Sequence, residues 1–393
     1  MPLSERLGQL TPTAVNAILK EVGTLCVDGP RPVSLMRGAP DLPTPEHIID
    51  AANRALANGR TGYPDNRGEP VLRDAVAQAI RDRGGPAYDP VSEILITTGA
   101  TLGIHSALGA ILNPGDEVLL PEPVYDAYTS VITVQGGRAV PVPAAIDNGR
   151  FTWPAERVAA AITPRTRALL VNSPWNPTGT VLSEGEWRSL MQVAAAHDLW
   201  VVSDEIYDSI CYDGHSHQSP ASLSDDARSR TIVVNSLSKT YAMTGWRVGY
   251  CAAPPDVIHG MYLILQQSSR GPATFVQDAA VAALTGSQDC VAEMNDEYAR
   301  RRQQVIEAFD DVDSASVMPP EGGFFAMLDV TALGRESNDV RRELLINHSV
   351  VVMHGGAYGP SGEGTLRLSF ASGGENLAEG LARVTSGLRQ LGS

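Results

Sequence analysis

Two hydrophobic patterns alternate through the middle of the chain. Short runs of apolar, β-branched residues predict buried strands at 93–98, 117–121, 168–172, 200–203, 231–235 and 248–253. Between several of them, apolar residues recur with helical spacing and predict helices at 102–112, 125–135 and 184–197. An alternation of strand and helix is typical of an α/β fold, a largely parallel sheet with helices on both faces.

The pattern differs at both ends of this region. Helices are predicted at 46–58 and 71–83, and a long polar helix at 289–309 precedes two strand candidates, GGFFAMLDV and TLRLSFA, and a closing helix at 376–391. A chain of 393 residues exceeds the usual size of a single hydrophobic core. We therefore expect a large domain over 46–285 and a smaller α+β domain over 286–393, which the N-terminal segment 1–45 joins.

The composition excludes some partners. A net charge of −15 without a basic run argues against binding to nucleic acid or to an anionic membrane. The sequence shows no signal-peptide core and no apolar stretch of about 18 residues that could span a bilayer. His215 and His217 form an HxH in a turn without further ligands nearby, so no metal site is expected. The four cysteines form no CxxC pattern and are expected to be reduced thiols of a cytoplasmic protein: Cys26, Cys211, Cys251 and Cys290.

Lys239 lies at the centre of the stretch NSLSKTYAMTGWRVG. The chain has only two lysines, Lys20 and Lys239, so 28 of its 30 Lys and Arg residues are arginine. An amine whose pKa is lowered can attack a carbonyl and form a Schiff base, whereas arginine stays protonated. The hydroxyls of Ser236 and Ser238 and the guanidinium of Arg247 suit a phosphate. Together they indicate pyridoxal 5′-phosphate (PLP), which carries both groups; a surface lysine on a Ser-rich turn is the alternative.

Four further side chains suit the ring of PLP. Asp204, in SDEIY, ends an apolar strand, where an unpaired carboxylate is costly. Held against the pyridine nitrogen, it would keep that nitrogen protonated and make the ring an electron sink. Tyr207 and Asn176 are placed to hydrogen-bond the ring 3′-oxygen, and Tyr125 is placed to stack on the ring. The alternatives are a helix N-cap or metal ligand for Asp204, a Pro-Gly turn for Asn176 and a core or helix-start position for Tyr125.

Gly99 and Thr101, in TTGATLG, lie where a predicted strand meets a helix. The free backbone N–H groups and the dipole of a helix start favour a phosphate, and the Thr101 hydroxyl adds a donor. An ordinary strand–Gly–helix turn is the alternative.

Arg367, in GTLRLSFA, lies inside an apolar strand. A buried arginine needs an anionic partner, and its planar fork fits a carboxylate through two hydrogen bonds. The sequence specifies no acid for it. The α-carboxylate of a substrate is therefore the sharper interpretation, and an internal salt bridge is the alternative.

These motifs occur in one order, from Gly99-Ala-Thr through Asn176-Pro-Thr-Gly and Lys239 to Arg367. In that order the sequence resembles the class I/II aminotransferases of PLP fold type I, the aspartate aminotransferase-like family, from about residue 30 to the C-terminus. The most specific motifs are SLSKTYAMTGWRVGY and NPTG. The resemblance implies an α/β fold with a mainly parallel seven-stranded sheet, PLP as cofactor and a homodimer with shared active sites.

The resemblance also implies a role for each matching residue. Lys239 would form the Schiff base and later move the proton, Asp204 would pair with the ring nitrogen, and Tyr125 would stack on the ring. Asn176 and Tyr207 would hold the 3′-oxygen. Arg367 would bind the α-carboxylate, Gly38 would line the substrate pocket, and Tyr63 would reach the phosphate of the neighbouring subunit. The phosphate would be held by Gly99, Ala100, Thr101, Ser236, Ser238 and Arg247.

Three stretches depart from the family pattern. The usual GxPDF reads GAPDL with Leu42, and Arg37 precedes it where a neutral residue is usual. The loop that is commonly PGxxFG reads HGGAYG, with His354 and Tyr358, and Trp175 directly precedes NPTG. Because these stretches adjoin the pocket in the family, they leave the substrate open. Arg37 is a candidate for binding a distal substrate carboxylate, against a surface or salt-bridge role.

The expected reaction is transfer of the amino group of an L-amino acid to a 2-oxo acid. Elimination or replacement at the β- or γ-carbon, cyclisation, or oxidation of an amino acid is the alternative on the same scaffold. Two other functions require features of their own. A cofactor-sensing regulatory domain requires an appended DNA-binding module, and a nicotinamide dehydrogenase requires a GxGxxG loop. The sequence shows neither pattern.

Overall fold

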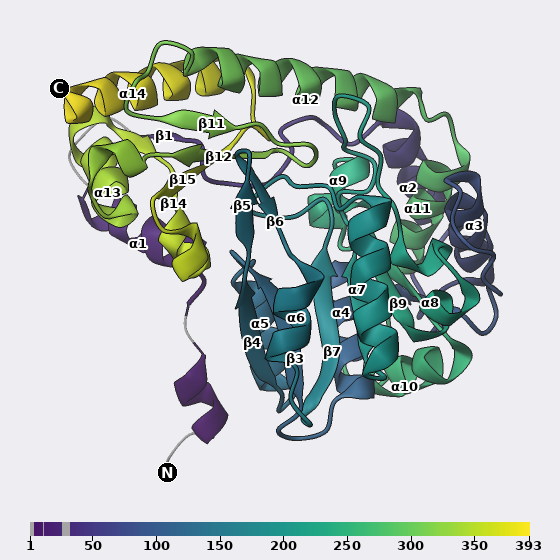
Figure 1. Ribbon diagram of the computed structural model, residues 1–393. Coiled ribbons are helices and arrows are strands. Elements are labelled where there is room, and N and C mark those ends of the chain that lie inside the picture. Colours follow the sequence, from purple (N-terminus) through teal and green to yellow (C-terminus); the bar gives the residue numbers. More distant parts are fainter. Residues whose placement is uncertain (1–3, 11, 26–31) are drawn as a thin grey trace.

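A seven-stranded mixed sheet forms the centre of the protein (Figure 1). The computed structural model describes residues 4–10, 12–25 and 32–393. The strand order is β2-β10-β9-β8-β7-β3-β4, and all neighbours are parallel except β10, which is antiparallel to both β2 and β9. The predicted α/β fold with a mainly parallel sheet is thus confirmed. The strands are β2 (Ile94–Thr97), β3 (Glu117–Glu122), β4 (Arg138–Pro143), β7 (Thr166–Asn172), β8 (Trp200–Asp204), β9 (Thr231–Ser236) and β10 (Gly249–Ala252).

Helices bury both faces of this sheet, because alternate residues of each strand point to opposite sides. In β9, Ile232 and Val234 face one helix layer, and Val233 faces the other. The first layer contains α4 (Gly99–Ile111), α5 (Ala127–Val134) and α10 (Pro255–Leu265). The second contains α2 (Glu46–Ala57), α3 (Pro70–Asp82), α6 (Ala155–Ala161), α7 (Glu184–Ala196), α8 (Asp225–Arg230) and α11 (Thr274–Thr285).

A second, antiparallel sheet has the order β11-β12-β15-β14. It packs with the C-terminal helices around a separate hydrophobic core (Figure 1). Its strands are β11 (Ser316–Met318), β12 (Phe325–Asp329), β14 (Met353–His354) and β15 (Thr365–Ser369), and the helices are α12 (Asp289–Ala308), α13 (Ser337–His348) and α14 (Gly374–Gly392).

The N-terminal segment lies against this second sheet region. Strand β1 (Val33–Ser34) pairs in parallel with β13 (Val350–Val351). Ile18 of α1 (Ala14–Leu25) packs with residues of α13 and β13. These contacts support the proposed assignment of residues 1–45 to the smaller domain; the domain boundaries themselves stay a prediction. A hairpin of β5 (Ala145–Asp147) and β6 (Arg150–Thr152) and the single turn α9 (Leu237–Thr240) complete the elements that matter here.

Several elements differ from the sequence prediction. Helix α4 begins at Gly99 instead of residue 102, and α5 begins at Ala127 instead of residue 125. Strand β4 was not predicted, because its sequence RAVPVP contains two prolines, which suit only an edge strand. Strands β11 and β14 are too short to show a period of two. Within the described ranges, the helices include none that combines the length and apolar character needed to cross a membrane.

The topology gathers the motifs at one edge of the large sheet. Strands β2, β3, β7, β8 and β9 all end there, because they run in the same direction. Asn172, Asp204 and Ser236 are the last residues of β7, β8 and β9. Ligands of open α/β sheets bind at such carboxyl ends.

Candidate active site

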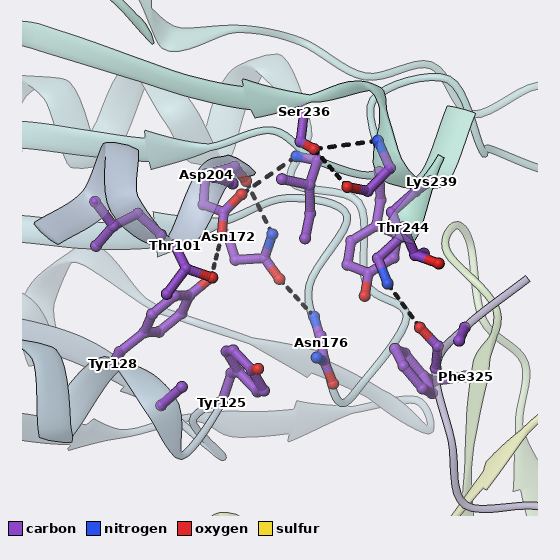
Figure 2. A pocket seen from close by; sticks show the side chains of 18 of the residues that line it. Thr101, Tyr125, Tyr128, Asn172, Asn176, Asp204, Ser236, Lys239, Thr244 and Phe325 are labelled. Carbon is purple, nitrogen blue, oxygen red and sulfur yellow. Dashed lines mark hydrogen bonds between the residues drawn. The ribbon is translucent and has the colours of Figure 1, made fainter. Parts of the chain in front are cut away.

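A cavity of about 330 Å³ lies at this edge (Figure 2). Its walls come from the strand ends of the large sheet, from the segment after β1, and from β12 and β15 of the second sheet. The predicted site residues that line it are Arg37, Gly38, Ala100, Thr101, Tyr125, Asn176, Asp204, Tyr207, Ser236, Ser238, Lys239, Arg247 and Arg367. Gly99 lies just behind Arg247. Tyr63 does not line the cavity, and 87% of its surface is exposed.

Lys239 projects into the cavity from α9, directly after β9. Its Nζ donates a hydrogen bond to the carbonyl oxygen of Gly38 at 2.6 Å (Figure 2). Burial, assisted by the positive charge of Arg247, lowers the pKa of the Lys239 amine to about 8. A sizeable fraction of this amine is therefore uncharged near neutral pH and able to act as a nucleophile or base.

Asp204 ends β8 and is almost completely buried, with 2% of its surface exposed. Its Oδ2 accepts a hydrogen bond from the hydroxyl of Tyr128 at 2.5 Å, and its Oδ1 accepts one from the backbone of Ile206 at 3.3 Å. Burial raises the pKa of Asp204 to about 6 although both bonds oppose this. Among the described residues no Lys, Arg or His forms an ion pair with it, so the carboxylate is available to a cationic group in the cavity.

The NPTG motif is linked to Asp204 through Asn172. The amide of Asn172 donates to the backbone oxygen of Asp204 at 2.9 Å, and its Oδ1 accepts from the backbone N–H of Asn176 at 2.8 Å. The Oδ1 of Asn176 in turn accepts from Arg367 Nη1 at 3.1 Å. The motif is therefore more than a turn, because it positions Asn176 between Asp204 and Arg367.

Ser236, Ser238 and Arg247 surround another part of the cavity wall. Ser236 Oγ donates to the carbonyl of Val248 at 2.9 Å, lies 2.7 Å from Ser238 Oγ and accepts from the backbone N–H of Ser238. Gly99 has a φ of +76°, and a Cβ added there would collide with the Arg247 guanidinium. Glycine at this position lets the arginine lie against the start of α4, where hydroxyls, N–H groups and a cation suit an anion.

Arg367 is buried in β15 between two aromatic rings. Its guanidinium carbon lies 4.2 Å from the ring centroid of Phe325 and 5.0 Å from that of Tyr358. It donates to the carbonyl of Met36 at 2.7 Å and to Asn176, whereas its buried Nε has no partner among the described residues. Within the described part of the chain no carboxylate pairs with Arg367, so an internal salt bridge is not what holds it there.

Several lining residues were not singled out by the sequence. Tyr128 and Asn172 both hydrogen-bond to Asp204, and Phe325 covers Arg367. Tyr128 follows Tyr125 by three positions, the spacing of neighbours on a helix, and this signal could have found it. Asn172 opens the NSPWNPTGT stretch, but its link depends on the pairing of β7 with β8. Phe325 comes from a different sheet and left no local signal.

Of the residues that depart from the family pattern, only some lie near the cavity. Trp175 does not line the cavity; it is a core residue whose indole donates to the carbonyl of Pro123 at 2.9 Å. Leu42 packs against the core of the second sheet, and His354 is half-buried outside the cavity. Tyr358 contacts Arg367 from outside the cavity wall. Arg37 lines the cavity and is exposed, and no ion pair involves it among the described side chains.

The HxH pair lies elsewhere. His217 Nε2 is 3.1 Å from Glu205 Oε2, and His215 Nε2 is 3.9 Å from Glu321 Oε1. In the described ranges, no three His, Cys, Asp or Glu side chains gather as a ligand set for a metal ion. Cys211, Cys251 and Cys290 are free thiols, and Cys26 lies outside the described residues.

Comparison with known proteins assigns the chain to a family. The model of the family "Aminotransferase class I and II" matches residues 30–384. The chain belongs to this family. The aminotransferase is 41% identical to an arginine–pyruvate transaminase of Pseudomonas aeruginosa over 88% of this chain and 87% of that protein. It is 36% identical to an aspartate aminotransferase of Pyrococcus abyssi over 99% of both chains.

Solved structures agree with this assignment. The aspartate aminotransferase of Rhizobium meliloti matches with a TM-score of 0.95 and 33% identity over 99% of both chains. The Thermus thermophilus enzyme with maleate matches with a TM-score of 0.91 and 36% identity, covering 98% of this chain and all of that chain. The protein is therefore a PLP-dependent aminotransferase, and amino-group transfer is favoured over elimination, cyclisation or oxidation.

The cavity of this aminotransferase fits PLP. Among the described residues, four cationic side chains line it, those of Arg37, Lys239, Arg247 and Arg367, against the single carboxylate of Asp204. Such a balance suits a ligand that brings a phosphate and a carboxylate. Within the part of the chain that the structure describes, the buried carboxylate of Asp204 has no cationic partner and the buried Nε of Arg367 has no acceptor. A pyridinium and a substrate carboxylate would satisfy these two groups.

Proposed function

We propose that this aminotransferase moves the amino group of an L-amino acid to a 2-oxo acid in the cavity around Lys239. The observation that carries the proposal is the convergence of Lys239, Asp204 and Arg367 on one cavity, from three elements distant in sequence. PLP, when bound, supplies an electron sink for the bonds at the substrate α-carbon. The chain supplies attachment, orientation and proton transfer.

The residues that would hold PLP divide by chemistry. Lys239 would attach it through Nζ, and Asp204 would keep the pyridine nitrogen protonated. Asn176 and Tyr207 would donate to the ring 3′-oxygen, since burial raises the pKa of the Tyr207 hydroxyl and keeps it a donor. Tyr125 would stack on the ring. The phosphate would be held by Gly99, Ala100, Thr101, Ser236, Ser238 and Arg247.

Lys239 also serves as the base. Once displaced by the incoming amino group, its Nζ would remove the proton from the substrate α-carbon and deliver it to the cofactor carbon to which Nζ had been attached. A pKa near 8 suits both directions of this transfer, because the amine accepts and returns a proton at little cost near neutral pH. Asp204, as the ionised carboxylate, would hold the protonated ring nitrogen.

Substrate binding is assigned to Arg367, Gly38, Asn176 and Arg37. Arg367 would bind the α-carboxylate, because its buried guanidinium has no carboxylate of its own among the described residues. Gly38 would leave room beside it, since a Cβ there would collide with the ring of Phe325. Arg37 would meet a distal carboxylate of an acidic substrate. The names of the relatives span arginine, aspartate and aromatic amino acids, so the substrate class is tested with a panel.

The proposal includes a cytoplasmic homodimer with shared active sites. Tyr63 supports this assembly, because it is exposed and does not line the cavity of its own subunit. A tyrosine reaching the phosphate from the partner would explain a large exposed aromatic side chain. The free thiols of Cys211, Cys251 and Cys290 support a reducing compartment.

Reduction with borohydride tests the attachment, and the chain makes the test unusually clear because it has only two lysines. PLP-loaded protein should give one reduced adduct on the peptide with residue 239, and Lys239→Ala should give none. Lys20→Ala, a change of an exposed residue of α1, is the matched control and should retain the adduct and activity. A panel of amino acids, each with a 2-oxo acid acceptor, should then show acceptor-dependent turnover. An adduct on Lys20, or ammonia release without an acceptor, would contradict the proposal.

A further inference from the structure

The strongest polar contact to Asp204 comes from Tyr128, which the proposed roles do not include. Tyr128 lies on α5 with 5% of its surface exposed, and its hydroxyl is 2.5 Å from Asp204 Oδ2. Its ring packs edge-on against that of Tyr125, with centroids 5.3 Å apart and an interplanar angle of 89°. Figure 2 shows the hydroxyl pointing directly at the carboxylate.

The direction of this hydrogen bond follows from the two groups. Burial and the neighbouring carboxylate raise the pKa of the Tyr128 hydroxyl well above its usual value, so it keeps its proton. Tyr128 is therefore the donor and Asp204 the acceptor. Apart from the long bond from Ile206, no other described residue donates to the side chain of Asp204. The titratable groups around Asp204 are Tyr125, Tyr128, Glu205, Tyr207, Lys239 and Cys251.

A neutral donor has an advantage over a cation at this position. Burial favours the uncharged carboxylic acid, and the negative charge of Glu205 acts in the same direction. An arginine or lysine paired with Asp204 would favour the ionised carboxylate. It would also cancel the negative charge of that carboxylate and repel a protonated ring nitrogen. A hydroxyl stabilises the carboxylate without adding charge.

We propose that Tyr128 is a positioning residue that keeps Asp204 ionised and oriented so that this carboxylate can hold the protonated ring nitrogen of PLP. The inference rests on the proposed role of Asp204. It adds a residue from the first turn of α5, three positions after Tyr125, which lies just before the helix.

Tyr128→Phe tests the inference, because it removes only the hydroxyl. The matched control is Tyr212→Phe, which removes an equally buried hydroxyl, bonded to the carbonyl of Gly323 at 2.6 Å, outside the cavity. We expect Tyr128→Phe to weaken PLP binding to the apoprotein by about ten- to a hundredfold, the usual range for a hydrogen bond to a charged group. The pH midpoint of the bound cofactor's absorbance change should rise by about one unit. Tyr212→Phe should change neither.

A double variant separates action through Asp204 from a general structural role. In an Asp204→Asn background the carboxylate is gone, so Tyr128→Phe should cause little further loss of PLP affinity. Additive losses would contradict the inference, as would a Tyr128→Phe protein with the affinity and pH midpoint of the wild type. If the wild type itself failed to bind PLP at Lys239, the proposed function would fail instead.

Discussion

The ring of Tyr358 covers the guanidinium of Arg367, with the Arg367 carbon 5.0 Å from the ring centroid. Phe325 covers the other side. The hydroxyl of Tyr358 is buried and has no hydrogen-bond partner in the described ranges, so Tyr358 contributes an aromatic face here. A cation between two aromatic rings gains attraction and loses rotational freedom, which orients its free donors toward the cavity.

Changes at Arg367 should affect substrates that carry an α-carboxylate. Arg367→Lys keeps the charge but loses the planar fork, so kcat/KM for an amino acid should fall by about a hundredfold. The rate with the corresponding amine, which lacks the carboxylate, should change little. Steady-state kinetics with each pair of substrates measures the ratio, and an equal loss for both would show that Arg367 does not bind the carboxylate.

Tyr358 should act through the same interaction. Tyr358→Leu removes the aromatic face, worth about 1 kcal/mol, and should raise KM for the amino acid by about fivefold. Tyr358→Phe retains the face and should behave like the wild type. A Tyr358→Leu protein with unchanged KM would mean that Phe325 and the hydrogen bonds suffice to hold Arg367.

The buried carboxylate of Asp204 should lower the free energy of unfolding of the apoprotein at neutral pH. Its folded pKa of about 6 lies above the unfolded value of about 3.9, so the native state binds more protons between these values. Stability therefore falls as the pH rises through this window, by up to about 3 kcal/mol. Asp204→Asn should be more stable than the wild-type apoprotein at about pH 7 and lose this advantage near about pH 4.

Urea unfolding of the apoproteins at both pH values measures this effect. Asp198→Asn is a suitable control, because the Asp198 side chain is 96% exposed and should change stability by no more than about 0.5 kcal/mol. If Asp204→Asn destabilised the apoprotein at neutral pH, the carboxylate would be contributing to folding and not only to the site.

Arg37 should distinguish acidic from neutral substrates. As an exposed cation at the cavity wall, it should favour a distal carboxylate modestly, so Arg37→Ala should lower kcat/KM for glutamate or aspartate by up to about fivefold. Added salt should reduce the difference, because exposed charges are screened. Arg389→Ala, an exposed arginine of α14 outside the cavity, is the control. An equal loss for acidic and neutral amino acids would remove Arg37 from substrate recognition.

Subunit mixing tests the shared site. Lys239→Ala and Tyr63→Ala subunits should each form dimers of low activity. In a hybrid dimer of the two, one site combines an intact Lys239 with an intact Tyr63 from the other chain. Random mixing by co-expression should therefore restore about a quarter of the wild-type activity. No recovery in confirmed hybrids would show that Tyr63 does not act across subunits.

The sequence predicted the reactive residues better than the residues that hydrogen-bond to them or pack against them. Lys239, Asp204 and Arg367 are unusual residues for apolar or Ser-rich surroundings. Asp204 and Lys239 lie at or just after strand ends that periodicity could locate, and Arg367 lies inside an apolar strand. The approach of Asp204 to Lys239 followed from the parallel direction of β8 and β9, whereas Arg367 reaches the same cavity from β15 of the second sheet. Tyr128 was not predicted as a site residue, because a tyrosine on an apolar helix face is typical of a core position.

Contacts between distant segments could not be predicted from the sequence. The approach of Phe325 to Arg367 depends on the pairing of β12 with β15, and that of Met36 depends on the segment after β1. Neither has a local pattern, because each partner is an ordinary apolar residue. The antiparallel direction of β10 also left no trace, since a strand buried on both faces is equally apolar in either direction.

The bond between Lys239 and the carbonyl of Gly38 connects the reactive amine to a segment 201 residues upstream. Attaching a carbon to Nζ as an imine removes two of its N–H bonds, so this contact cannot be the same before and after the cofactor is attached. The backbone around Gly38 also carries Arg37, whose carbonyl accepts from Ser369, and Met36, whose carbonyl accepts from Arg367. We expect cofactor attachment to change the hydrogen bonding of this segment, so hydrogen exchange in residues 34–41 should differ between the apoprotein and the PLP-loaded protein.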